Sequence, residues 1–348
     1  MKLHWKDIHN DAERWYGLAV QLTPAEADAQ CKPAMRIESG ANGRLKLMQG
    51  ETPLLWATVC QRHEGAHVLR SFNNFAPAIP PGSIDSALVE HISRLEPACR
   101  LPAWSRHFAS ALAASPTSFF YPGLWLLAGV KPDGDAWTFT AERWSGNGRT
   151  GNWSVREATQ ALRASPVSFI SWFVHHEGDV DSQDTDSLVN LRKLTGDDEG
   201  RLKWWRKKAR ERSLPPVLLW FVDALQAYVV TDGHLRLQAA ILENLPPDFI
   251  VSYSAQEEAI YQDPVKQQHI VNAVLKPGFP ARSVSEINRI LTLAFDDRPV
   301  TVSRTRAWAR IASDAIWLSE VDAQLRAVGR LDALPGFAER VENRPSPL

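Results

Sequence analysis

Residues 229–240, VVTDGHLRLQAA, place an Asp-Gly pair between a β-branched run and a series of helix formers. A glycine directly behind a strand pattern predicts a turn, because it adopts positive φ or lets another group approach the backbone closely. The leucine and alanine residues that follow predict a helix beginning near His234. The chain is therefore expected to change from strand to helix within this one turn.

The flanking sequence extends this unit in both directions. The segment DEGRLKWWRKKARER (198–212) predicts a helix, and SLPPVLLWFV and AYVVT predict two strands joined by a tight DALQ connection. Pro246-Pro247 ends the helix after the Asp-Gly turn, and DFIVSYS predicts a third strand. The predicted order is helix, strand, strand, helix, strand.

The start of the helix at His234 has the properties of an anion site. Free N–H groups and the positive end of the helix dipole meet there, and phosphate is a common occupant of such sites. Asp232 is expected to accept hydrogen bonds from the backbone N–H groups ahead of it. His234 supplies a donor or a base, and Arg236 supplies a charged fork suited to phosphate oxygens. The alternative is an ordinary turn followed by a solvated first helical turn.

The stretch ARERSLPPVLLWFVDALQAYVVTDGHLRLQAAILENLPPDFIVSY resembles the core of the ParB/sulfiredoxin superfamily. Those domains carry a basic helix, a G-L-x-x-P-hydrophobic strand start, a hairpin, and then D-G-x-x-R-x-x-A-A. Leu214-Pro215-Pro216-Val217 matches the second element, and Asp232 to Arg236 with Ala239-Ala240 matches the last. The resemblance covers about residues 185–255. It implies a small mixed sheet with helices and a nucleotide phosphate held at the turn.

This resemblance implies roles for individual residues. His234 and Asp232 are candidate catalytic residues, with Asp232 also a candidate magnesium ligand. Thr231, Gly233, His234 and Arg236 are candidate binding residues for a nucleotide, either ATP/ADP or CTP, together with Mg²⁺.

The sequence also differs from single branches of the superfamily. No cysteine lies near the turn, unlike in sulfiredoxins, and the helices after residue 256 lack the basic recognition face of partition proteins. The DGHxR spelling is closest to the free serine kinases, in which an upstream glutamate acts as base. Asp197, Asp198 and Glu199 occupy that upstream region here.

The expected fold class is α+β, with the ParB/sulfiredoxin-like core flanked by other regions. These are an α+β region over 1–164, the core domain over 165–255, a helical region over 256–340 and a disordered tail over 341–348. The acidic segment 177–186 is the expected boundary of the core domain.

Shorter elements are predicted within the flanking regions. The first region contains a strand at 53–59, a Pro-rich loop at 75–83, a helix at 84–95, a hairpin at 124–144 and a Gly/Asn-rich loop at 145–154. The helical region contains helices at 255–275, 283–295 and 303–328, and Ser283 with Glu286 forms a capping box at the start of the second.

Composition argues against several classes of protein. The 39 basic and 40 acidic residues give a net charge of −1, so the chain as a whole has no attraction to nucleic acid or anionic lipid. Cys31, Cys60 and Cys99 are odd in number and widely spaced, which supports neither a disulfide framework nor a zinc ribbon. His175-His176-Glu177 matches no established ligand spacing, so no metal site is predicted. The N-terminal segment lacks the apolar run of a signal peptide and no segment is long enough to span a bilayer, which predicts a cytoplasmic protein without membrane contact.

Three functional hypotheses follow from these observations. The first is a nucleotide-binding enzyme, a phosphotransferase or a nucleotide hydrolase, that uses the Asp232 to Arg236 turn. The second is a non-catalytic immunity or adaptor-type protein that keeps the fold and binds a protein partner. The third is nucleic-acid binding or cleavage through the basic helix 201–212, with Trp204 and Trp205 as stacking platforms. The neutral overall charge disfavours the third.

Overall fold

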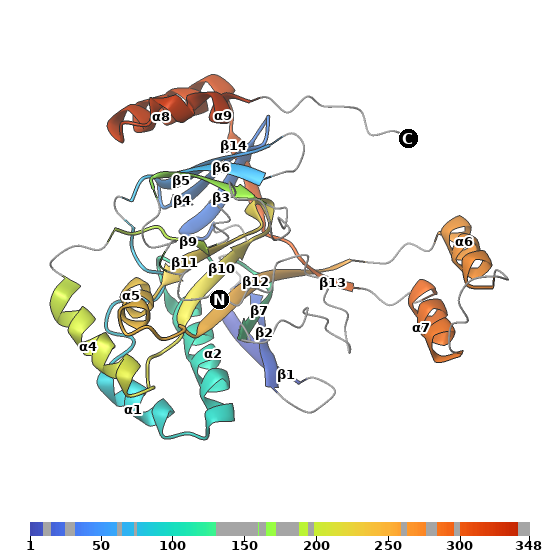
Figure 1. Cartoon of the computed structure of the whole chain (residues 1–348), viewed down its shortest axis with the longest axis horizontal. Coiled ribbons are helices and arrows are strands. Elements are labelled where there is room, and N and C mark those ends of the chain that lie inside the picture. Colours follow the sequence, from blue (N-terminus) through green and yellow to red (C-terminus); the bar gives the residue numbers. More distant parts are fainter. Residues whose placement is uncertain are drawn as a thin grey trace. The chain divides into compact units, whose positions relative to one another are not determined.

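The computed structural model describes residues 1–9, 15–24, 32–60, 65–72, 75–129, 159, 165–171, 188–193, 198–258, 263–275, 284–295 and 300–339. Its fold class is α+β, with two mixed sheets (Figure 1). The strands are β1 (Lys2–His9), β2 (Trp15–Thr23), β3 (Met35–Gly40), β4 (Arg44–Gln49), β5 (Thr52–Val59), β6 (Gly65–Arg70), β7 (Gly123–Gly129), β8 (Val167–Ser171), β9 (Leu188–Val189), β10 (Val217–Val222), β11 (Ala227–Asp232), β12 (Phe249–Glu258), β13 (Val300–Ser303) and β14 (Ala307–Ile311). The helices are α1 (Ser86–Ser93), α2 (Pro97–Ala114), α4 (Glu199–Arg210), α5 (His234–Leu242), α6 (Pro264–Leu275), α7 (Val284–Ala294), α8 (Asp314–Ala327) and α9 (Leu334–Ala338).

The chain divides into two compact units. The larger contains residues 1–136, 148–255 and 304–348, and the smaller contains residues 137–147 and 256–303. In the smaller unit α6 and α7 pack against each other. The candidate site described below lies within the larger unit.

One sheet has the strand order β1-β2-β7-β12-β10-β11-β9, and β13 pairs with β12 beside this path. β10 and β11 form the predicted antiparallel hairpin, and β12 runs parallel to β10. Every residue of β10 and β11 is buried, as expected for continuous apolar runs in the middle of a sheet. The connection from β11 to β12 runs through α5, so the Asp-Gly turn lies where the chain leaves the sheet.

The other sheet has the order β14-β3-β4-β5-β6-β8, and its two faces pack against different elements. Leu55 and Ala57 of β5 point into a core that both sheets share, whereas Trp56 packs against residues of α8 and α9. This alternation follows the two-residue period of a strand. Figure 1 shows α8 and α9 beside this sheet.

A buried arginine fixes α8 and α9 to the sheet. Arg44 of β4 is fully buried, and its Nε donates to Asp314 at 2.8 Å. Its Nη1 donates to the Thr58 hydroxyl at 3.0 Å and to the Phe337 carbonyl oxygen. The guanidinium also lies 5.0 Å from the ring centroid of Trp317. The C-terminal helices are therefore held by charge and hydrogen bonds as well as by apolar contact.

The boundaries between the predicted regions differ from the observed connectivity. The regions 1–164 and 165–255 were expected to be separate, but β7 pairs with β12 and β6 pairs with β8. Strands from both regions therefore share each sheet. The expected helical region also contributes a strand, because β14 pairs with β3.

Most local predictions in the described part of the chain are confirmed. β5, α1, α4, the β10–β11 hairpin, α5 and β12 lie where the sequence predicts them. The helix predicted over 303–328 is wrong before Asp314, because residues 307–311 form β14 and the helix begins at Asp314. The helix predicted over 255–275 begins only at Pro264, because β12 continues to Glu258.

Several predictions fall outside the described residues. These are the second strand of the 124–144 hairpin, the 145–154 loop, the histidine pair at 175–176, the acidic boundary segment, Ser283 of the capping box and the 341–348 tail. Among the helices that are described, none combines the length and apolar character needed to cross a bilayer.

Candidate functional site

A pocket of about 200 Å³ opens at the N-terminal end of α5. Three segments line it: the turn and first helical residues at 232–236, α4 together with the residues before it, and the Pro-rich loop that precedes α1. The sequence-predicted turn is therefore one wall of a cavity rather than an isolated surface turn.

The turn itself depends on Gly233. Its φ is +93° and its ψ is +21°, in the left-handed region that glycine adopts without strain. A Cβ built at this position would lie 2.7 Å from Nη2 of Arg236, so a side chain would collide as well as be strained. Gly233 is also the N-cap of α5, and no side chain caps the helix. The expectation that Asp232 accepts backbone N–H bonds as a cap is wrong, because its carboxylate is turned to Arg236 instead.

The first helical N–H groups consequently remain available. The first intrahelical bond of α5 runs from the Leu237 N–H to the Gly233 carbonyl oxygen at 2.8 Å. The N–H groups of residues 234–236 precede this bond and have no partner within the helix. Together they concentrate partial positive charge at the pocket wall.

His234, the first residue of α5, is buried and lines the pocket. Its Nε2 has no hydrogen-bond partner among the described residues. Its ring packs edge-on against Phe75, with 5.0 Å between centroids. Burial, together with the charges of Arg192 and Arg236, lowers the pKa of the imidazole to about 3. His234 is therefore neutral at physiological pH, with one ring nitrogen left for a ligand.

Arg236 is 4% exposed and holds the turn together. Its Nη2 donates to Asp232 at 2.7 Å and to the Pro216 carbonyl oxygen at 3.0 Å, and its Nε donates to the same carbonyl oxygen at 3.2 Å. Its guanidinium lies 5.5 Å from the ring centroid of Trp205. Arg236, the residue predicted to bind phosphate, thus lines the pocket. Its hydrogen bonds, however, link α5 to the end of β11 and to the residue that precedes β10.

Two further arginines line the opposite wall. Arg192 is paired with Asp198, and its Nη2 donates to the two carboxylate oxygens at 2.7 and 2.9 Å. Arg201 makes no ion pair within the described part of the chain. Its Nη2 donates to the Ile84 carbonyl oxygen at 3.5 Å, and its guanidinium lies 5.6 Å from the ring centroid of Trp205. Three guanidinium groups and two carboxylates line the pocket, so its formal charge is +1 (3 − 2).

The Pro-rich loop forms the apolar wall of the pocket and is tied to the turn. Pro77, Ile79 and Ile84 line the cavity. The Ala78 N–H donates to the carbonyl oxygen of Thr231 at 2.8 Å, which fixes the loop beside the end of β11.

Four of the five predicted site residues meet at this pocket: Asp232, Gly233, His234 and Arg236. Thr231 lies outside it, with its hydroxyl donating to the Leu218 carbonyl oxygen at 3.2 Å. Of the three upstream acids, Asp198 lines the pocket, Glu199 is exposed in the first turn of α4, and Asp197 lies outside the described residues.

Sequence reasoning missed the contribution of Arg192 and the Pro-rich loop, because no local pattern relates them to residue 232. The sequence places Arg201 and Trp205 on a basic helix but does not relate them to the pocket at the turn. No protein-family model, curated protein or solved structure matches this chain.

Proposed function

We propose that this pocket binds the phosphate of a nucleotide, in a core of the ParB/sulfiredoxin type. The observation that carries the proposal is the convergence of uncapped N–H groups of α5, the unpartnered Nε2 of His234 and three guanidinium groups on one cavity. The hairpin, the Asp-Gly turn, α5 and the parallel strand β12 follow one another in the order that the sequence resemblance implies.

The charges of the pocket favour an anionic ligand. Each carboxylate already faces a guanidinium group, Asp198 facing Arg192 and Asp232 facing Arg236. The guanidinium of Arg201 faces no carboxylate within the described part of the chain and contacts only the Ile84 carbonyl oxygen, at 3.5 Å, and the Trp205 ring. This guanidinium and the helix N-terminus therefore supply the positive charge that would attract a ligand. A phosphate oxygen beside Nε2 of His234 would also give that atom the partner it lacks, since a buried polar group without one is costly.

The size and walls of the pocket favour a phosphate ester over free phosphate. Its volume of about 200 Å³ is more than ten times the roughly 10–15 Å³ that a cavity needs to hold one water. The Pro-rich loop and Trp205 provide apolar surface for the organic part of the ligand. ATP, ADP and CTP are the expected ligands, and Asp232 and Asp198 are the carboxylates that Mg²⁺ would approach.

A phosphotransferase or nucleotide hydrolase is the enzymatic form of this proposal. Phosphoryl transfer depends mainly on positioning and on stabilisation of charge, which the helix N-terminus and Arg201 would provide. Asp198 is the carboxylate in the pocket that would accept a proton from a hydroxyl or water, and His234 is a neutral donor or acceptor lining the same pocket.

A thermal-shift panel with ATP, ADP, CTP and GTP, with and without Mg²⁺, tests the proposal. A nucleotide at one hundred times its Kd adds about 2.7 kcal/mol to the free energy of unfolding. Arg201→Gln should weaken binding at least tenfold, because it removes a charged hydrogen bond worth about 1.5–3 kcal/mol. Lys203→Gln is the matched control, since Lys203 is exposed on the same helix but does not line the pocket.

Two results would count against nucleotide binding at this pocket. One is a wild-type protein that no nucleotide stabilises, which would favour the non-catalytic interaction protein. The other is equal weakening by Arg201→Gln and Lys203→Gln, which would indicate diffuse attraction to the basic helix.

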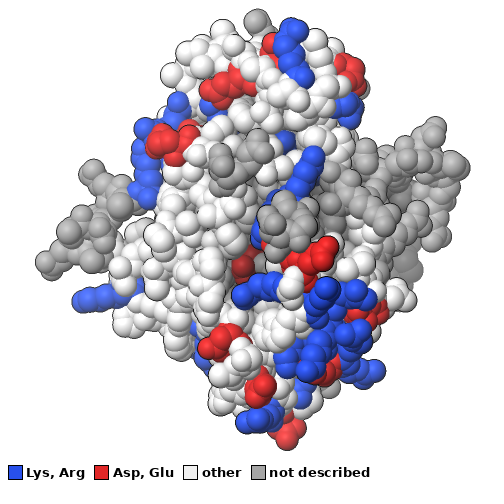
Figure 2. All heavy atoms as spheres, turned by 90° about the vertical axis from the view of Figure 1, so that its left-hand side faces the viewer, with Lys and Arg blue, Asp and Glu red and all other residues white. Residues whose placement is uncertain are grey.

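The basic helix supports nucleic-acid binding as a second candidate. Figure 2 shows Lys and Arg gathered on the side of the molecule where α4 lies. Exposed basic side chains of this region are Arg201, Lys203, Lys207, Arg210 and Arg212. Trp205 is 2% exposed and packs in the core, so the expected pair of stacking platforms is reduced to the half-buried Trp204. Affinity that falls steeply with salt, with no dependence on the pocket residues, would identify this function.

A further inference from the structure

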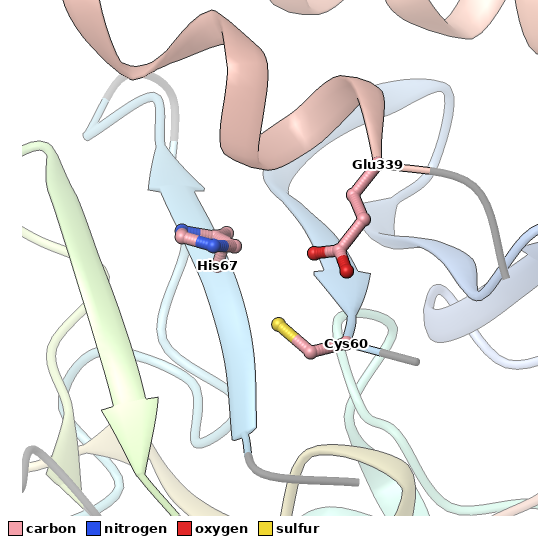
Figure 3. Close-up of side chains that lie close together, drawn as sticks. All are labelled: Cys60, His67 and Glu339. Atoms are coloured by element: carbon pink, nitrogen blue, oxygen red, sulfur yellow. The ribbon is translucent and has the colours of Figure 1, made fainter. Parts of the chain in front are cut away.

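Three side chains of the kinds that bind transition metals converge at one end of the β5–β6 pair. They are Cys60 directly after β5, His67 in β6 and Glu339 directly after α9. One ligand atom of each lies within 4.8 Å of the other two. Figure 3 shows the thiol, the imidazole and the carboxylate pointing toward one another. None of the three lines the pocket at α5.

Strand pairing sets two of these positions. His67 is directly opposite Thr58 in the antiparallel register, and the Cys60 N–H donates to the Gly65 carbonyl oxygen at 2.9 Å. Residues two apart in a strand share a face, so Cys60 lies on the same face as Thr58 and beside His67. Cys60 and His67 therefore both face α9.

Packing of α9 sets the third position. The Thr58 hydroxyl donates to the Phe337 carbonyl oxygen at 3.1 Å. A Cβ built on Gly336 would lie 2.6 Å from the His67 ring, so this glycine lets the helix approach the imidazole closely. Glu339 lies three residues after Gly336. The contacts of Thr58 and His67 with α9 therefore also bring Glu339 close to the sheet.

The donor set suits zinc and similar divalent ions. Zinc binds thiolate, imidazole and carboxylate, with metal–ligand distances of about 2.0–2.3 Å that place tetrahedral ligand atoms ~3.4–3.8 Å apart. The observed separations of up to 4.8 Å would close to these values with a movement of about 1 Å, which side-chain rotation provides. Magnesium and calcium prefer oxygen ligands, so the sulfur and nitrogen donors disfavour them.

We propose that Cys60, His67 and Glu339 bind one zinc-class divalent ion, with water completing the tetrahedron. Cys60 is 9% exposed, which suits a small ion better than an organic substrate. Binding would join the chain after α9 to the β5–β6 pair, adding to the attachment that Arg44 already makes.

Cobalt substitution of the full-length, metal-depleted protein tests this site. Co²⁺ should bind with one equivalent and give the strong visible bands of tetrahedral coordination together with a thiolate charge-transfer band. Zn²⁺ should then displace it. Cys60→Ser should abolish the charge-transfer band, whereas Cys99→Ser, which changes an exposed cysteine on α2, should leave it unchanged.

The carboxylate is tested separately. Glu339 is exposed, so Glu339→Gln should fold normally and weaken Co²⁺ affinity at least tenfold while retaining the charge-transfer band. The proposal is overturned if no saturable one-equivalent band appears, if Cys60→Ser keeps the band, or if Glu339→Gln binds Co²⁺ as tightly as the wild type. Should Cys60→Ser fail to fold, the wild-type titration and Glu339→Gln still decide.

Discussion

His234 should make the larger unit markedly less stable as pH falls. Its imidazole is neutral in the folded protein because burial, together with Arg192 and Arg236, lowers its pKa to about 3. In the unfolded chain a histidine titrates with a pKa of about 6.5. Between these two values the unfolded state binds one more proton than the folded state, so acid favours unfolding. The stability that depends on this group is present above pH ~6.5 and is lost as pH falls toward 3.

The size of this effect follows from the linkage relation. Between pH 7 and pH 5 the unfolded histidine goes from mostly neutral to mostly charged, which removes about 2 kcal/mol from the free energy of unfolding. The value depends little on the folded pKa, provided that it stays well below 5. His67 and His107 also have pKa values lowered chiefly by burial, so the His234 contribution must be isolated by difference.

Urea unfolding of wild type and His234→Gln at pH 7 and pH 5, followed by tryptophan fluorescence, provides that difference. Glutamine is neutral at both values, so the variant should lose about 2 kcal/mol less than the wild type over this interval. His91→Gln, which changes an exposed histidine on α1, is the control and should follow the wild type. Parallel losses in wild type and His234→Gln would refute a buried, neutral His234.

Two other perturbations test how the turn and the C-terminal helices are held. Gly233→Ala should destabilise the protein by about 1–3 kcal/mol, because it combines a positive φ with a collision against Arg236, whereas Gly200→Ala in open space on α4 should be neutral or stabilising. The midpoints of urea unfolding measure both changes in stability, provided that the dependence of the free energy on urea concentration is the same in each variant. Arg44→Met should cost about 3 kcal/mol, since it leaves a partly buried carboxylate without its partner, and calorimetry should show a lowered Tm. Arg326→Met, which breaks an exposed pair on α8, should leave Tm nearly unchanged.

The sequence predicted the region 198–258 well because its signals are local. The β-branched runs, the DALQ connection and the Asp-Gly turn each determine the structure of only a few neighbouring residues. The apolar runs also matched the full burial of β10 and β11. Four of the five predicted site residues were consequently found together.

The prediction was wrong where pairing is distant in sequence. Residues 307–311 read as part of a helix, yet they form β14 because β3, far away in the chain, offers a parallel edge. For the same reason the sequence does not show that strands from residues 1–164 and 165–255 share each sheet. No local pattern in β7 shows that it pairs with β12.

The α5 pocket and the proposed metal site also depend on contacts between residues that are distant in sequence. Arg192 and the Pro-rich loop reach the α5 pocket only through the fold. The loop is held there by the backbone hydrogen bond from Ala78 to Thr231 and by side-chain hydrogen bonds with Gln49 and Thr117. Cys60, His67 and Glu339 have no ligand spacing that a sequence scan would recognise, because α9 brings the carboxylate to the other two.

The 256–303 segment of the smaller unit leaves the larger unit and returns to it at neighbouring residues. The Arg304 N–H donates to the Ser254 carbonyl oxygen at 2.9 Å, so the two ends of the 256–303 segment are joined by a backbone hydrogen bond. Inserted modules are tolerated where chain ends lie this close. We therefore expect that residues 256–303 can be deleted and replaced by a short linker, and that β10, β11 and α5 still form as in the full chain.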